Sequence, residues 1–154
     1  MTRDDGETLS ETGFLSDGSD DREQLASALM SALDGDAPIV VYHESFEKGR
    51  LQELADALPH YAEQLMAISD RIVDLLPVVR NTISGVDRHS LKVIAPIADP
   101  AFNYADLQIQ NGGIANAVMT LLTLDGGVQT LQTTTGMDVE TARSALLAYC
   151  ARDT

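Results

Sequence analysis

The apolar run from Pro38 to Tyr42 constrains the fold of this chain more than any other feature of the sequence. A run of this length is typical of a parallel strand that is buried on both faces. The residues from Ser45 to Ala57 then predict a helix, which places Glu47 on the first helical turn beyond the carboxyl end of the strand. Open α/β sheets carry their chemistry at that edge. We therefore expect an α/β fold with Glu47 near its functional edge.

Helices and short apolar runs alternate along the rest of the chain. Asp20 and Glu23 have the spacing of a capping box, which predicts a helix that ends near Gly35. A second strand is expected over residues 72–76, and Phe46 is expected to face the core from the helix over Ser45–Ala57. The other expected elements are helices near residues 61–68, 90–96 and 114–122 and from Asp138 onward, with loops at 82–89 and 97–111. Residues 125–136 are rich in Gly and Thr and show no clear period.

The N-terminal residues predict a hairpin. Asp5-Gly6 supplies the positive φ values that a tight hairpin turn requires, and Glu7 to Ser16 would form the returning strand. Residues 1–19 are then an N-terminal hairpin or strand region, and residues 20–154 are the α/β body. At 154 residues the chain has room for one domain with its own core.

The charge balance limits the partners of the chain. Ten Lys and Arg residues against 24 Asp and Glu residues give a formal net charge of −14. Because phosphate contacts need cations, this balance counts against a broad nucleic-acid-binding surface. The N-terminus has neither a basic start nor an apolar stretch, and no segment approaches the length of a membrane span, so we expect a cytoplasmic location and no membrane contact.

The last helix carries the second candidate site. Tyr149 and Asp153 are four residues apart, so the phenol and the carboxylate share one helix face and can address one site. Together with Glu47, Asp153 is a candidate metal ligand. The single cysteine, Cys150, permits no internal disulfide, and we expect it to be a small buried side chain rather than a nucleophile.

Two motifs resemble those of the ribonuclease-H-like 3′–5′ exonucleases (DEDD type). The stretch from Val41 to Glu47, VYHESFE, resembles their second motif, usually Asn-x-x-Phe-Asp, and Tyr149-x-x-x-Asp153 resembles their third. The phrases PIVVYHESFEKGRLQELA, RIVDLLPVVRN, SLKVIAPI and ALLAYCARDT also resemble the bacterial family catalogued as domain of unknown function 2779. This resemblance runs from about Asp5 to Thr154. It implies a partial ribonuclease-H-like fold, in which helices flank a short mixed sheet that lacks its first strands.

The sequence departs from the exonuclease pattern in two respects. His43 stands where the superfamily usually has Asn, and Glu47 stands where it usually has Asp. The first motif, Asp-x-Glu at the end of a strand, is missing, because Asp5-Gly6-Glu7 has no apolar strand before it. We therefore expect either a truncated or incomplete exonuclease-like domain, or a sequence whose start codon has been assigned too far downstream.

The resemblance implies phosphodiester hydrolysis with two Mg²⁺ or Mn²⁺ ions held by carboxylates. Glu47 and Asp153 would be metal ligands, with Asp74 as an alternate ligand, and Tyr149 would orient the attacking water. His43 and Phe46 would lie beside the substrate. Glu47 and Tyr149 can also be explained by structural roles alone. A helix N-terminus favours the negative charge of Glu47 without any metal, and Tyr149 fits a core position.

Three functional hypotheses remain open at this stage. The first is a remnant of an exonuclease-like domain that is inactive alone because its first two carboxylates are absent. The second is a working nuclease, acting on DNA or RNA, that obtains the missing strands and ligands from a partner protein or an upstream segment. The third is a non-enzymatic acidic interaction module, whose uncovered sheet edge would favour pairing with another strand or self-association.

Overall fold

The computed structural model describes residues 12–153, which form two compact units. The larger unit spans residues 16–106 and includes Asp153, and the smaller unit comprises residues 12–15 and 107–152. None of the helices in these described residues is long and apolar enough to cross a bilayer. The prediction of one domain over residues 1–154 stays a prediction.

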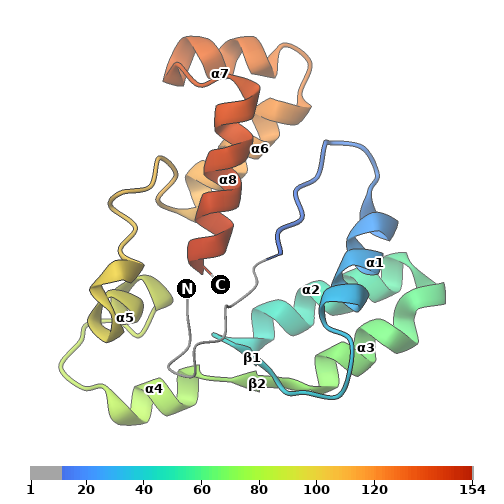
Figure 1. The fold of residues 1–154 in the computed structure, drawn as a ribbon, viewed down its shortest axis with the longest axis vertical. Helices are drawn as coiled ribbons and strands as arrows, with labels where there is room; N and C mark the ends of the chain where they lie inside the picture. Colours follow the sequence, from blue (N-terminus) through green and yellow to red (C-terminus); the bar gives the residue numbers. More distant parts are fainter. Residues whose placement is uncertain (1–11, 154) are drawn as a thin grey trace, which may run out of the picture. The chain divides into compact units, whose positions relative to one another are not determined.

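The larger unit holds the strands and most of the helices (Figure 1). Its elements are α1 (Arg22–Ala32), β1 (Ile39–Val41), α2 (Glu44–Ala57), the 3₁₀ helix η1 (Pro59–Tyr61), α3 (Ala62–Asp70), β2 (Ile72–Asp74), α4 (Leu76–Thr82), α5 (Leu91–Ala98) and the 3₁₀ helix η2 (Pro100–Phe102). The smaller unit contains α6 (Gly112–Thr123), α7 (Gly127–Thr135) and α8 (Val139–Asp153), whose last residue belongs to the larger unit.

The sheet consists of β1 and β2 within the described residues, and the two strands are parallel. The register pairs Ile39 with Ile72, Val40 with Val73 and Val41 with Asp74. The helices α2 and α3 make the crossover that a parallel pair requires. The predicted α/β class is therefore confirmed in its coarse form, as a mostly helical chain with a small sheet, and this sheet is parallel rather than mixed.

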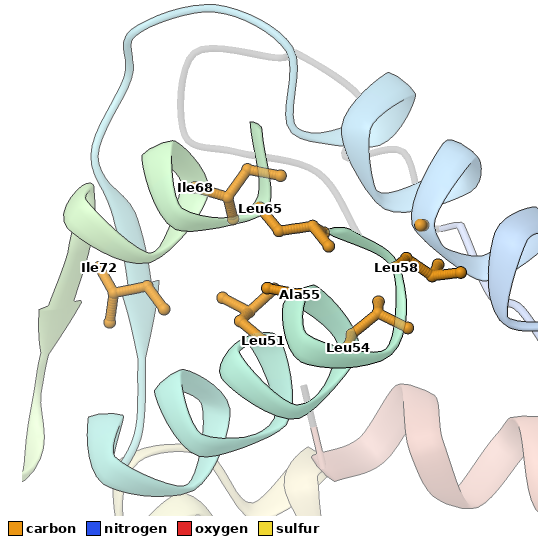
Figure 2. Close-up of a cluster of buried hydrophobic side chains, with 8 residues drawn as sticks. Leu51, Leu54, Ala55, Leu58, Leu65, Ile68 and Ile72 are labelled. Atoms are coloured by element: carbon orange, nitrogen blue, oxygen red, sulfur yellow. The ribbon is translucent and has the colours of Figure 1, made fainter. Parts of the chain in front are cut away.

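The core of the larger unit lies between α2, α3 and one face of the sheet. Figure 2 shows Leu51 and Leu54 of α2 near Leu65 of α3, with Ile72 of β2 at the sheet side of the cluster. Leu65 is fully buried. The guanidinium of Arg71 donates hydrogen bonds to the carbonyl oxygens of Leu33 and Ala37, which ties the end of α1 to the entry of β1. These contacts hold the amino ends of the two strands beside α1.

Several local predictions are confirmed. The run Pro38–Tyr42 contains β1, and the helix predicted over Ser45–Ala57 is α2. The expected burial of this strand on both faces is wrong, because Val40 is 59% exposed. The helix predicted near residues 114–122 is α6, whose N-cap Asn111 accepts a hydrogen bond at Oδ1 from the Ile114 N–H at 3.0 Å. Asp138 Oδ1 accepts from the Thr141 N–H at 2.8 Å and caps α8, and this backbone hydrogen bond lowers the pKa of Asp138.

Other predictions are wrong about the end of a strand, the cap of a helix and the presence of a helix. The strand expected over residues 72–76 ends at Asp74, and α4 follows it. Asp20 does not cap α1, because Asp21 holds the N-cap position and the Asp20 carboxylate pairs with Arg22 instead. Residues 125–136, which showed no period, contain α7.

Two side chains expected to be buried are exposed. Phe46 is 63% exposed, whereas Leu51, Leu54 and Ala55 are the buried residues of α2. Cys150 is exposed beside the buried Tyr149 on α8.

The N-terminal hairpin is tested only in part. The Asp5-Gly6 turn and the start of the returning strand lie outside the described residues. Residues 12–16, the described end of that expected strand, do not form a strand.

We predict that Leu65→Ala destabilises the larger unit by about 3 kcal/mol, because it leaves a cavity in the fully buried centre of the core. Urea unfolding followed by circular dichroism measures the loss. The matched control is Val78→Ala on α4, where the side chain is 58% exposed and the change should cost no more than about 0.5 kcal/mol. A cost below about 1 kcal/mol for Leu65→Ala would contradict this description of the core.

Candidate functional site at the carboxyl edge of the sheet

The carboxyl ends of β1 and β2 meet at one edge of the parallel sheet, and most of the predicted site residues lie there. Tyr42 and His43 follow β1, and α2 begins directly after them. Asp74 is the last residue of β2. The edge is therefore built from two strand ends and the first turn of a helix.

Asp74 joins the two strand ends through its carboxylate. Its Oδ1 accepts hydrogen bonds from the His43 N–H at 2.8 Å and from the Leu76 N–H at 2.9 Å. Burial acts to raise the pKa of Asp74, but backbone hydrogen bonds from Leu76, His43 and Glu44 outweigh it and hold the pKa below its usual value. Asp74 thus serves as an ionised acceptor for the N–H groups that open α2 and α4.

His43 adopts a left-handed backbone conformation, which is uncommon for residues other than glycine. Its φ of 78° and ψ of 71° lie in the left-handed region. Among residues other than glycine, His is one of those that enter this region more readily than most. The His43 ring uses Nδ1 to contact Ser45 Oγ at 3.0 Å. His43 is therefore a turn residue, held by Asp74 at its N–H and by Ser45 at its ring.

Glu47 lies in the first turn of α2. Its side chain is half-buried, and its Oε2 is fully buried with no hydrogen-bond partner in the structure. Phe46 beside it is exposed, and the Arg50 guanidinium lies 5.5 Å from the centre of the Phe46 ring. Of the carboxylates predicted from the motifs, Glu47 is the one with an unsatisfied buried oxygen.

The end of the last helix supplies Tyr149 and Asp153. Tyr149 is buried in the smaller unit, on the apolar side of α8. Asp153, which belongs to the larger unit, accepts a hydrogen bond from the Tyr104 hydroxyl at 2.9 Å. Tyr104 could not be predicted as the partner of Asp153, because it falls in a stretch that was predicted to be loop. A buried aromatic residue with a polar tip is the one available signal.

The hydrogen bonds thus bring Asp74 and His43 together, and Glu47 lies near them along α2. In the part of the chain that the structure describes, no group of three or more His, Cys, Asp or Glu side chains is arranged to hold a metal ion. The assignments of Glu47, Asp153 and Asp74 as metal ligands, and of Tyr149, His43 and Phe46 to roles beside the substrate, remain proposals.

Tyr42 fastens the loop after α4 to the same edge. Its hydroxyl donates to the His89 carbonyl oxygen at 2.6 Å, and His89 Nε2 lies 2.8 Å from the Ile83 carbonyl oxygen. Burial raises the pKa of Tyr42, while Arg80 acts to lower it. The phenol therefore stays protonated at neutral pH and acts as a donor.

We predict that Asp74→Asn lowers the melting temperature at neutral pH, and that the difference from the unchanged chain disappears in acid. The pKa of Asp74 is depressed on folding, so its contribution is complete above the unfolded value of about 3.9 and is lost as the pH falls through the lower folded value. Thermal melts of both chains between pH 7 and pH 2 measure the difference. A difference that persists unchanged to pH 2 would contradict the assignment.

The comparisons with known proteins point to one family. The model of the family described as Domain of unknown function (DUF2779) matches residues 1–98. The matched range contains His43, Glu47 and Asp74 and ends before Tyr149 and Asp153. Neither the curated proteins nor the solved structures contain a significant match. Since the match covers more than half of the 154 residues, the chain belongs to the family Domain of unknown function (DUF2779).

Proposed function

We propose that this chain is a remnant of a metal-dependent 3′–5′ exonuclease-like domain with a partial ribonuclease-H-like fold. In this proposal Glu47 still binds a divalent cation, while the carboxylates needed for phosphodiester hydrolysis are incomplete. The observation that carries the proposal is the buried Oε2 of Glu47, which lacks a hydrogen-bond partner at the carboxyl edge of a parallel sheet.

A buried carboxylate oxygen without a partner is costly, because it has lost its water and gained nothing in return. A bound ion is one common reason why a buried polar atom lacks a hydrogen-bond partner within the protein. Mg²⁺ and Mn²⁺ prefer oxygen ligands of this kind. The N-terminus of α2 also favours a negative charge, but this field provides no donor to the Glu47 Oε2 atom. A divalent cation would satisfy the oxygen, with water completing its coordination.

The other acidic residues fit a complete two-metal centre less well. Asp74 already uses Oδ1 to accept two backbone N–H groups, and Asp153 accepts from Tyr104. Two-metal hydrolysis needs several carboxylates that share a pair of ions about 4 Å apart. The net charge of −14 also opposes the approach of a nucleic acid. These points favour a remnant over a catalyst that works alone.

The second candidate function is an active nuclease completed by a partner. The small size of the sheet favours it, because two parallel strands seldom form a complete sheet. A partner that adds strands could also add carboxylates at the same edge. In that case the substrate would be DNA or RNA, and the purified chain would be inactive without the partner.

We predict one saturable Mn²⁺ site in the purified chain, detected by isothermal titration calorimetry. The isosteric change Glu47→Gln should weaken it at least tenfold, because a neutral amide oxygen replaces the charged ligand. The matched control is Glu63→Gln, which removes the same charge from an exposed position on α3. The proposal fails if the unchanged chain shows no saturable site, or if both variants weaken binding equally.

We also predict that the chain does not degrade single-stranded DNA or RNA in Mn²⁺ above the rate of a buffer control, because its carboxylate set is incomplete. Gel assays with end-labelled oligonucleotides measure this. Degradation that Glu47→Gln and Asp153→Asn each abolish would show a working nuclease and overturn the remnant proposal.

A further inference from the structure

The backbone of β1 is hydrogen-bonded on one side only among the described residues. The Ile39 N–H donates to the Arg71 carbonyl oxygen at 2.9 Å, and the Leu75 N–H donates to the Val41 carbonyl oxygen at 2.9 Å. The ladder therefore uses the backbone groups of Ile39 and Val41. Because successive residues of a strand direct these groups to opposite sides, the N–H and C=O of Val40 point away from β2. This side of β1 is a free edge.

The sheet face that carries Val40 is also uncovered. Val40 and Val73 are paired in the register and so project from the same face, where they are 59% and 49% exposed. The opposite face packs Ile72 into the core between α2 and α3. Parallel sheets are normally covered on both faces. The exposed valine pair therefore offers an apolar surface that another segment can cover.

The two outer edges of the sheet are not equivalent. The outward backbone groups of β2 belong to Ile72, which is buried, and to Asp74, which is half-buried. On the outer side of β1, Val40 is exposed and Pro38 marks the position before the strand. Proline is found at the first residues of strands and on edge strands, where its missing N–H costs nothing. A new strand would therefore add beside β1.

The net charge of the chain indicates which kind of segment can bind at the edge of β1. A second copy would bring another net charge of −14 to the interface, so pairing between copies is opposed. The negative charge of the chain favours an extended segment with basic ends, because opposite charges attract. Apolar side chains at alternate positions of that segment would cover Val40 and Val73, and its backbone would bond to the free groups of Val40.

We propose that the outer edge of β1 is a docking site for an extended segment of a partner polypeptide, apolar at alternate positions and flanked by Lys or Arg, which adds to the sheet as a third strand. The site uses main-chain hydrogen bonds for affinity and the Val40–Val73 surface for specificity. It does not depend on the cation site of Glu47.

The test uses the full chain in EDTA and the peptide Lys-Thr-Val-Thr-Val-Thr-Val-Lys as the probe, with binding followed by NMR titration. We expect saturable binding and slowed exchange of the Val40 amide proton with solvent. A peptide that has proline in place of each threonine cannot pair as a strand and should not bind. A peptide with Glu in place of Lys should bind at least tenfold more weakly, because its ends repel the acidic chain.

Val40→Pro removes the free N–H without touching the β1–β2 ladder and should abolish peptide binding while leaving the melting temperature nearly unchanged. Val40→Thr keeps the N–H and is the matched control, so it should retain most of the binding. The proposal is overturned if the peptide does not bind, if the Val40 amide exchange does not slow, or if the proline peptide binds equally well. Should Val40→Pro fail to fold, the exchange of the Val40 amide in the unchanged chain decides. A dimer in sedimentation whose formation protects the same amide would assign the edge to a second copy instead.

Discussion

The pair of hydrogen bonds accepted by Asp74 holds the carboxyl edge of the sheet together. One carboxylate oxygen binds the N–H groups of His43 and Leu76, which open the turns into α2 and α4. The depressed pKa of Asp74 keeps this acceptor charged at neutral pH. Because His43 occupies a left-handed conformation, the turn needs such support. The position of Glu47, one turn further along α2, depends on it.

The fold could be predicted where local pattern and tertiary packing agree. The strand within Pro38–Tyr42 was recognised as a continuous apolar run, and the helix after it was predicted from the residues that follow this run. The helix α7 was missed because Thr and Gly have low helix propensity. Its threonine hydroxyls bond back to carbonyl oxygens four residues earlier, and the fully buried Leu131 anchors it. Gly127 fits the α6–α7 corner, where a Cβ atom would lie 2.1 Å from the Leu121 carbonyl oxygen.

Only the part of the candidate site that follows directly from the end of a predicted strand could be predicted from the sequence. The place of Glu47 follows from a strand and the helix after it, and the structure agrees. The capping role of Asp74 could not be predicted, because its partner His43 is 31 residues away in sequence. The hydrogen bond between Tyr104 and Asp153 spans 49 residues and has no local signal. The sequence alone does not predict which distant residues form hydrogen bonds with polar side chains such as these.

Anomalous diffraction from crystals soaked in Mn²⁺ tests the central claim most directly, because it locates the ion rather than its heat of binding. The account predicts a manganese peak roughly 2.1 Å from Glu47 Oε2, with water completing the coordination. It also predicts that the two hydrogen bonds to Asp74 Oδ1 remain in place. A map without a peak at Glu47, or with manganese bound only elsewhere on the acidic surface, would contradict the account.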